Sequence, residues 1–236
     1  YYPHVGEEGT VPPVQTVEIT SENQDTPEER AAFDFLYASA KATKAEPNVH
    51  LNFNHAMSRV NLKFVPGTDP EGNPVTLTDI ECYLVGIKRN GTFDTETGVA
   101  AVTEDAAVSD LRQMLNADND YTFTAYLLPQ TIGAEGLQIE AAMTTADGRR
   151  IYYFLEIPVS DWPEMKAGYS YNYTLTANDY MTASPTVLEI SGTDINPWTE
   201  VNKEETPDAK ALGTEAYVNG AEWGEMENEE IVPEVK

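Results

Sequence analysis

Two histidines, His50 and His55, lie five positions apart and are followed closely by Ser58. Histidine is a common zinc ligand and general base, so this group could indicate a metal site or a nucleophilic site. A zinc site needs three or four converging ligands, and the chain has only one further histidine and one cysteine. In an extended strand, positions 50 and 55 lie on opposite faces. We therefore expect no metal site, and we expect His55 to form a local hydrogen bond at a kink in the strand.

The serines and acidic residues match the residue types of catalytic sites but not their patterns. No Gly-x-Ser-x-Gly motif is present, and Ser58 falls within a strand-like alternation rather than on a strained turn. Asp94 and Glu96 could form a glycosidase acid pair, but exposed acid-rich turns are far commoner than catalytic dyads. No glycine-rich phosphate loop occurs. We expect that the chain is not an enzyme and has no catalytic residues and no cofactor.

A stripe of tyrosines offers a different kind of site. Tyr169, Tyr171 and Tyr173 alternate with polar residues, so they share one face of a predicted strand. Exposed aromatic rings could bind sugars by stacking, whereas the same pattern more often marks a sheet face packed on a core. Both interpretations remain open from the residues alone.

The charge of the chain excludes several classes of partner. Its 236 residues include 40 acidic and 14 basic side chains, which gives a net charge of −26. Such an anionic surface repels phosphate backbones, so we expect no nucleic-acid partner. No run of 18 apolar residues occurs, so we expect no membrane-spanning segment. Cys82 is the single cysteine and cannot form an intramolecular disulfide.

Two segments have helical signals. Thr26 is a good N-cap, Pro27 suits the first helical position, and Glu29 completes a capping box. The apolar residues that follow at helical spacing predict a helix of roughly 14 residues; they are Phe33, Leu36, Tyr37 and Ala40. A second short helix is predicted at 103–115 from the spacing of Val108, Leu111 and Leu115.

The remaining segments show the two-residue alternation of strands. In the first of the larger ones, Val60, Leu62 and Phe64 lie on one face, and Asn61 and Lys63 lie on the other. Other strands are predicted at 14–20, 76–87, 121–131, 137–159, 167–177 and 186–198, with hairpins around Asn90-Gly91 and Asp147-Gly148. Strands do not alternate with helices, which argues against a parallel sheet. We expect a mainly β fold, an antiparallel β-sandwich with one or two short helices and an extended acidic C-terminal arm.

Several blocks, taken in order and spacing, resemble the fimbrillin (Mfa-like) family of type V pilins. They are LNFNHAMSRVNLKF (51–64), DIECYLVGI (79–87), GTFDTETG (91–98), YLLPQT (126–131), MKAGYSYNYTL (165–175) and DINPW (194–198). The upstream YYPH (1–4) and DFLYASA (34–40) fit the same pattern, so the resemblance extends from residue 1 to about 199. These blocks are structural signatures, and none of them is catalytic.

The resemblance implies a fold and a way of assembling. Members of the family have two transthyretin-like β-sandwich domains and are exported as lipoproteins. A protease trims an N-terminal segment, and the gap accepts a strand from the next subunit, which gives a polymer on the outer membrane. This sequence departs from the pattern because it lacks most of the expected N-terminal domain and the lipid-bearing cysteine, and because its acidic stretch after Trp198 is longer.

We therefore expect three parts: an N-terminal segment at 1–48, with a short strand and a helix, as the remnant of an N-terminal domain; a transthyretin-like β-sandwich at 49–199; and an acidic arm at 200–236. The arm has 11 acidic and 3 basic residues and too little apolar content for its own core. Its weakly apolar alternation could complete the sheet of another subunit as a donor strand, or the arm could be a solvated tail. The donor-strand candidates are Ala216, Tyr217, Val218, Ala221, Trp223, Ile231 and Val232.

Two functions from different classes follow. The first is a structural subunit of a cell-surface pilus or fimbria, which polymerises by donor-strand addition and supports adhesion. Its partners would be other copies or related pilin subunits, and host or bacterial surface receptors, at an extracellular, outer membrane-attached location. The alternative is a monomeric surface lipoprotein that binds glycans through an exposed aromatic face.

Overall fold

In the computed structural model, strands make up most of the part of the chain that the structure describes. The structure describes residues 14–19, 24, 26–41, 43, 49–76, 78–113, 121–134, 136–158, 164–180, 186–198 and 215–218. Within these ranges the single α-helix, α1, is Pro27–Ala31. No helix in this described part has the length and apolar character needed to cross a bilayer.

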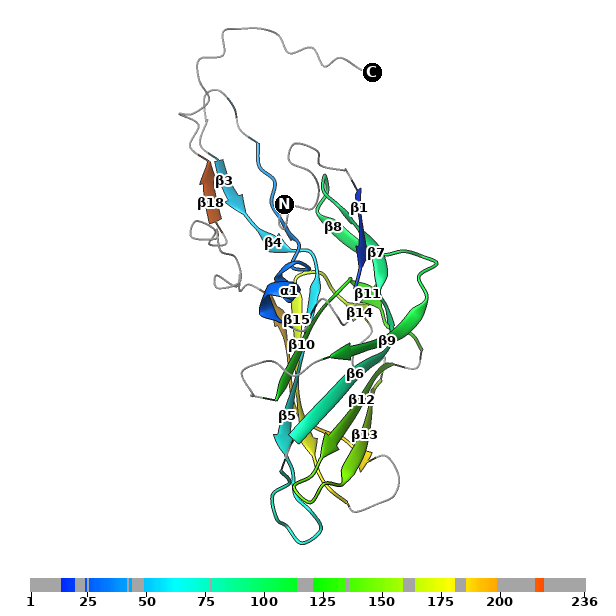
Figure 1. Ribbon diagram of the computed structural model, residues 1–236. Coiled ribbons are helices and arrows are strands. Elements are labelled where there is room, and N and C mark those ends of the chain that lie inside the picture. Colours follow the sequence, from blue (N-terminus) through cyan, green and yellow to red (C-terminus); the bar gives the residue numbers. More distant parts are fainter. Residues whose placement is uncertain are drawn as a thin grey trace.

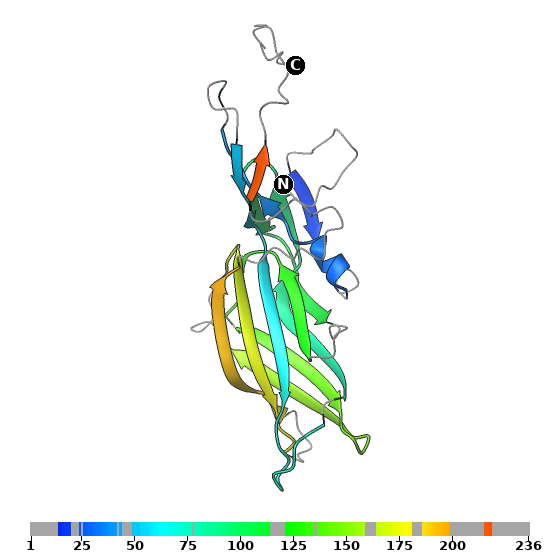
Figure 2. The ribbon, with the colours of Figure 1, turned by 90° about the vertical axis from the view of Figure 1, so that its left-hand side faces the viewer.

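A four-stranded sheet forms one layer of the larger body of the molecule (Figures 1 and 2). Its strands, in spatial order, are β10 (Thr122–Leu127), β5 (Ser58–Pro66), β15 (Tyr169–Ala177) and β17 (Glu189–Pro197). The outer pairs are antiparallel, but β5 and β15 run parallel. This parallel pair departs from the expected pairing, because two strands so distant in sequence need no hairpin to connect them.

A five-stranded sheet forms the facing layer. Its order is β16 (Thr186–Val187), β13 (Arg150–Ile157), β12 (Leu137–Thr144), β6 (Thr78–Lys88) and β9 (Val108–Gln113). The hairpin predicted at Asp147-Gly148 is confirmed, since Thr144 pairs with Arg150 across that turn. Gly148 has a φ of 86°, a conformation that favours glycine at this position.

Smaller strand pairs lie beyond the end of this sandwich at which α1 is found (Figure 1). One sheet has the order β1 (Val14–Glu18), β7 (Asn90–Asp94) and β8 (Val99–Val102). The two-stranded pairs are β2 (Leu36–Tyr37) with β4 (Asn54–His55), β11 (Gln130–Thr131) with β14 (Glu164–Met165), and β3 (Val49–Asn52) with β18 (Glu215–Val218). Segment 1–48 thus contributes β1 to a sheet that it shares with later strands.

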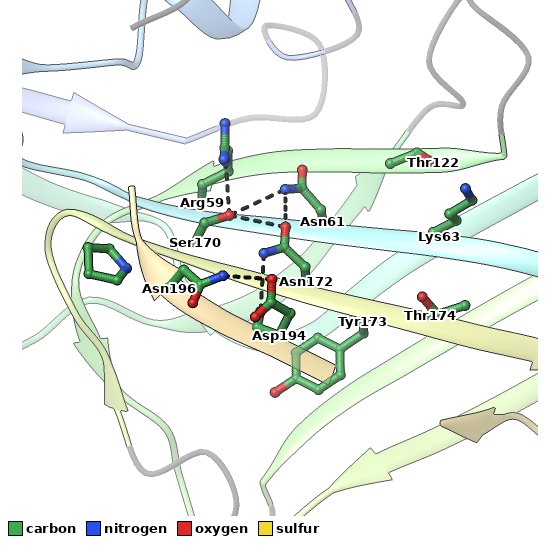
Figure 3. A pocket seen from close by; sticks show the side chains of 11 residues that line it. Arg59, Asn61, Lys63, Thr122, Ser170, Asn172, Tyr173, Thr174, Asp194 and Asn196 are labelled. Atoms are coloured by element: carbon green, nitrogen blue, oxygen red, sulfur yellow. Dashed lines mark hydrogen bonds between the residues drawn. The ribbon is translucent and has the colours of Figure 1, made fainter. Parts of the chain in front are cut away.

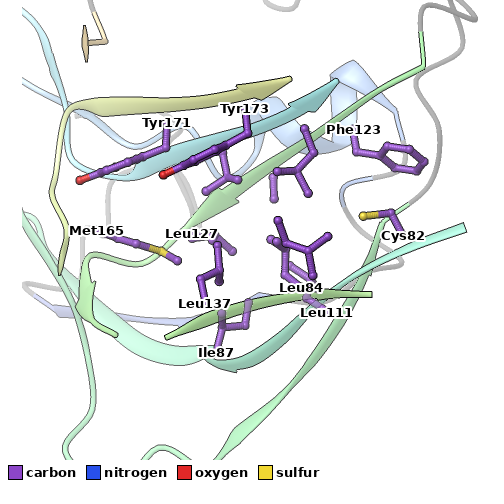
Figure 4. Packing of buried hydrophobic residues seen from close by; sticks show 14 of the residues in the cluster. Cys82, Leu84, Ile87, Leu111, Phe123, Leu127, Leu137, Met165, Tyr171 and Tyr173 are labelled. Atoms are coloured by element: carbon purple, nitrogen blue, oxygen red, sulfur yellow. The ribbon is translucent and has the colours of Figure 1, made fainter. Parts of the chain in front are cut away.

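The core lies between the two large sheets, where apolar side chains from both layers meet (Figure 4). Val60, Leu62 and Phe64 are buried there, as the alternation in β5 predicts. Phe64 packs edge-to-face on Phe123, with ring centroids 5.5 Å apart. Cys82 is also buried, and its burial raises the pKa of its thiol. The mainly β sandwich expected from the sequence is therefore confirmed.

The predicted helix after Thr26 is much shorter than expected. The capping box of Thr26 and Glu29 is present, but α1 ends at Ala31. Tertiary contacts end it: Phe35 is buried and stacks on Phe93 at 4.7 Å, and Leu36 pairs with β4. Burial of this aromatic ring and formation of a strand pair outweigh the modest preference of the segment for a helix.

The predicted helix at 103–115 is wrong, because β9 occupies Val108–Gln113. Leu111 is buried and lies opposite Leu84 of β6. Val108 is 64% exposed, so the two side chains do not share a buried helical face. The register shift between Leu84 and Ile87 adds its extra residue to β6, so β9 itself alternates regularly. Val108 and Leu111 therefore lie on opposite faces of β9, and their helix-like spacing is coincidental.

The hairpin predicted around Asn90-Gly91 is also misplaced. Asn90 begins β7, and the turn of this hairpin lies four residues later, between Asp94 and Val99. Asp94 caps that turn, because its Oδ1 accepts hydrogen bonds from the backbone N–H groups of Glu96 (2.8 Å) and Thr97 (3.1 Å). An aspartate at the start of a turn thus decides the position of the hairpin more strongly than the Asn-Gly pair.

Candidate functional site

The two histidines of the opening motif do not converge. His50 lies exposed on β3, whereas His55 is buried at the end of β4. His55 Nδ1 forms a hydrogen bond with Asp34 Oδ1 over 2.5 Å, so its partner is distant in sequence rather than local. Among the described residues, no group of three or more histidine, cysteine and acidic side chains is arranged to hold a metal ion.

Aromatic and charged groups surround His55 and close the top of the sandwich. The imidazole stacks on Trp198, with ring centroids 3.6 Å apart, and Tyr126 packs on the same indole at 4.8 Å. The Arg59 guanidinium lies 4.8 Å from the indole centroid, a cation–π contact. Burial raises the pKa of Asp34, although its hydrogen bond to His55 opposes this shift. The cluster therefore joins β4, β5, β10 and the residue that follows β17.

The other catalytic candidates have structural roles. Ser58 Oγ donates to the backbone carbonyl of Lys166 over 2.9 Å, so its hydroxyl is used within the fold. Asp94 caps the β7–β8 turn through the N–H of Glu96. The backbone N–H groups of Thr97 and Glu96 lower the pKa of Asp94, whereas the general acid of a glycosidase needs a raised pKa.

Two tyrosines of the β15 stripe, Tyr171 and Tyr173, face the core (Figure 4), and the third, Tyr169, is partly buried and packs against it. Tyr171 and Tyr173 are both 3% exposed, and Tyr171 Oη donates to the carbonyl of Glu164 over 2.9 Å. A sugar cannot stack on buried rings, so the aromatic face that the glycan-binding alternative required is not available on this strand.

Three of the donor-strand candidates lie in β18, which pairs antiparallel with β3 of the same chain (Figure 1). The register places Ala216 opposite Leu51, Tyr217 opposite His50, and Val218 opposite Val49; the other candidates, Ala221, Trp223, Ile231 and Val232, lie outside the described residues. The arm segment at 215–218 thus forms a backbone ladder with a strand that directly precedes the sandwich.

A second strand-binding surface is the outer edge of β17. This strand is the end strand of its sheet in the described part of the chain, and eight of its nine residues are exposed. Ile190 and Ile195 lie opposite Leu175 and Tyr171, so they share the core face of the sheet. They are nevertheless 42% and 41% exposed. The core face is therefore left open at this edge.

Sequence reasoning missed the role of these two isoleucines. Ile190 and Ile195 belong to a segment that was expected to close the series of strands, and their spacing shows no simple alternation. The register of β17 shifts at the Thr174/Leu175 position, which explains how residues of unlike parity reach one face. The sequence signal for this shared face was an isoleucine on each side of a glycine, Ile190 and Ile195 around Gly192, since a glycine within a strand often marks a bulge.

Comparison with protein families gives a match to the family described as fimbrillin-like, over residues 1–198. The match ends at Trp198, so the acidic arm lies beyond it. Comparison with curated proteins gives no match.

Comparison with solved structures supports the fold. A candidate cell adhesion protein from Bacteroides ovatus ATCC 8483 is 24% identical, with a TM-score of 0.63 over 85% of this chain and 67% of that one. Another, from Bacteroides uniformis ATCC 8492, is 17% identical, with a TM-score of 0.59 over 84% of this chain and 70% of that one. At these identities the likeness concerns the fold alone.

Proposed function

Because the chain belongs to the fimbrillin-like family, we propose that it is a structural subunit of a cell-surface pilus or fimbria. The subunit polymerises by donor-strand addition and supports adhesion. Its role is architectural rather than catalytic. Its partners are other copies or related pilin subunits, and a surface receptor where the subunit lies at a free end. Its location is extracellular, on an appendage attached to the outer membrane.

The observation that supports this proposal most directly is the β3–β18 pair. Glu215–Val218 lies beyond the family match, yet it forms an antiparallel ladder with Val49–Asn52. A four-residue strand without a core of its own depends on the edge that receives it. Backbone hydrogen bonds form equally well with the β3 of a neighbouring copy, so the arm is suited to exchange between subunits.

The open edge of β17 supports the same proposal. Ile190 and Ile195 expose apolar surface on the core side of the sheet, and the edge backbone groups of β17 face outward. A strand added there would bury both side chains and extend the sheet. We propose that Ala221, Trp223, Ile231 and Val232 supply the apolar side chains of such a strand.

The three-part organisation is part of the proposal. Residues 49–199 form the transthyretin-like sandwich of a type V pilin, 200–236 form the donor arm, and 1–48 are the remnant of an N-terminal domain. In this arrangement, β1 from the first segment adds to β7, which links the remnant to the sandwich.

Cysteine pairing across the arm ladder tests strand exchange. Val49 and Val218 are directly opposite, so a disulfide between them is within geometric reach. Two variants, Val49→Cys and Val218→Cys, are mixed, incubated under assembly conditions and oxidised. Exchange of the arm gives a covalent dimer that contains one of each variant. The native Cys82 does not compete, because it is buried.

The matched control mixes Val49→Cys with Glu215→Cys. Glu215 lies opposite Asn52, at the other end of the ladder, roughly 10 Å away along the strand. This pair should give no dimer. The double variant Val49→Cys/Val218→Cys reports on pairing within one chain. Strand exchange fails as an explanation if the double variant closes on itself while the mixture of single variants never forms a dimer.

A further inference from the structure

The outer face of the four-stranded sheet contains a polar hollow of about 720 Å³ (Figure 3). Its floor is formed by residues that alternate with the buried core residues of β5 and β15. The strand register arranges them in rungs. One rung joins Arg59, Ser170 and Asn196; the next joins Asn61, Asn172 and Asp194; and the third joins Lys63, Thr174 and Gly192. The reverse side of the tyrosine strand is therefore an ordered surface of amides, hydroxyls and charges.

The middle rung is held in place by its own hydrogen bonds. Asn61 Nδ2 donates to Asn172 Oδ1 over 2.6 Å, and Asn172 Nδ2 donates to the backbone carbonyl of Asp194 over 3.1 Å. Asn196 Nδ2 donates to Asp194 Oδ2 over 2.6 Å. Side chains that are already fixed lose little conformational entropy when a ligand binds, so this floor is preorganised.

The fixed side chains keep bonding capacity for a ligand. An amide group has two N–H donors, and only one from Asn172 and one from Asn196 are used in these contacts. The second oxygen of the Asp194 carboxylate can accept a hydroxyl hydrogen. The third rung ends at Gly192, where the missing side chain leaves room above Thr174. The amide donor of Asn172 and the carboxylate acceptor of Asp194 lie on adjacent strands, so they are separated by about the 4.8 Å spacing between strands.

The charges of the hollow differ from those of the whole chain. Lys63 and Arg59 lie at its two ends on β5, in a protein whose net charge is −26. Lys63 is exposed, and within the described residues its ammonium group has no carboxylate partner. Arg59 is held by the Trp198 indole and by Ser170 Oγ, to which its Nε donates over 3.0 Å. An anion is therefore attracted to the β5 side of the hollow.

We propose that this hollow binds an acidic saccharide. The carboxylate or sulfate group of the sugar pairs with Lys63, and its hydroxyl groups bond to Asn172, Asp194 and Asn196. A polyphosphate fits less well, because it has few hydroxyl groups that could donate to Asp194. An acidic peptide strand also fits less well, because the backbone groups of β5 and β15 beneath the hollow are already paired within the sheet.

The test measures binding to the monomer of residues 1–236 by calorimetry. The probes are trigalacturonate, a chondroitin sulfate tetrasaccharide and neutral maltotetraose. We expect saturable binding of at least one acidic probe, with maltotetraose about tenfold weaker or undetectable. Lys63→Ala should weaken the acidic probe about tenfold and Lys63→Arg should retain it, since an exposed lysine can be replaced without loss of folding. The matched control is Lys41→Ala, an exposed lysine outside the hollow.

Three results would overturn the proposal. The first is that neither acidic probe shows saturable binding. The second is that Lys63→Ala and Asn196→Ala leave the binding unchanged. The third is that a peptide of residues 200–236 displaces the probe, which would make the acidic arm the natural occupant. Saccharide binding is a property separate from the assembly role, and it is measured on monomers. Failure here therefore leaves strand exchange untouched, and failure of strand exchange leaves the saccharide site untouched.

Discussion

His55 and Trp198 stack face to face, with ring centroids 3.6 Å apart and ring planes within 9° of each other. His55 ends β4, ahead of the first strand of the four-stranded sheet, and Trp198 directly follows its last strand. The stack therefore joins the residues at the start and at the finish of the chain segment that forms the sandwich. It also positions Arg59, because the guanidinium of this residue lies against the Trp198 indole.

Removal of the Trp198 indole should make the sandwich easier to unfold. Trp198 is 4% exposed, and its ring contacts His55, Tyr126 and Arg59. We expect Trp198→Ala to lower the free energy of unfolding by about 3–5 kcal/mol, as for other buried aromatic truncations. Urea denaturation followed by far-UV circular dichroism measures this. The control Tyr152→Ala removes a 61% exposed ring and should change stability by about 0.5 kcal/mol or less. Equal effects of the two variants would contradict this assignment.

The β12–β13 turn should respond to acid through Asp147. The Thr145 hydroxyl donates to this carboxylate and Arg149 Nε donates to it over 3.0 Å, which lowers the pKa of Asp147 from 3.8 to about 2. A folded-state pKa below the unfolded value stabilises the folded protein above pH 3.8, and this contribution is lost as the pH falls toward 2. Wild type and Asp147→Asn should therefore differ at pH 7 and converge near pH 2. A carboxyl NMR titration with its midpoint near 4 would refute the prediction.

Two glycines differ in what an added methyl group would meet. A Cβ at Gly91 would lie 2.2 Å from the carbonyl oxygen of Ala101, and that oxygen belongs to the backbone of the neighbouring strand. Gly133 has no atom within 4 Å of the corresponding position. We expect Gly91→Ala to destabilise the fold by about 1–3 kcal/mol. Gly133→Ala should be neutral or stabilise by up to about 1 kcal/mol. Thermal unfolding of both variants decides the matter, and an unchanged melting temperature for Gly91→Ala would count against the close β7–β8 approach.

The sequence predicts which side chains are buried more reliably than which strands pair. Alternation alone puts Val60, Leu62 and Phe64 on one face of their strand, because successive side chains of a strand point to opposite faces, and the structure buries that face. It also puts the tyrosines of β15 on one face, but only the structure shows that Tyr171 and Tyr173 are buried. The same alternation places Asn61 and Asn172 on the outer faces of their strands. Nothing local indicates that these two amides, 111 residues apart, form a hydrogen bond. The polar hollow depends on that long-range parallel register.

Segments near strand ends show a different limit. The capping box at Thr26 is a local signal, and it forms as predicted. The length of the helix after it is decided by the burial of Phe35 on Phe93, a contact between residues far apart in the chain. Similarly, residues 108–113 join β6 as an edge strand because the edge is available, whatever their helical spacing. Local rules hold at caps and turns, and tertiary contacts override them between these points.

The open edge of β17 should affect association more than stability. Ile195 lies on the core face opposite Tyr171 but is 41% exposed, so a polar replacement loses only part of a buried side chain. We expect Ile195→Lys to cost about 1 kcal/mol of unfolding free energy while reducing self-association, because a lysine at a strand edge opposes the addition of another strand. Asn196→Lys is the matched control: it adds the same charge on the adjacent residue, which faces the outer side of the sheet. Sedimentation velocity over a concentration series compares the two variants with the parent. If both variants associate as the parent does, the edge of β17 is not where subunits meet. If both lose association equally, added charge rather than the apolar edge is responsible.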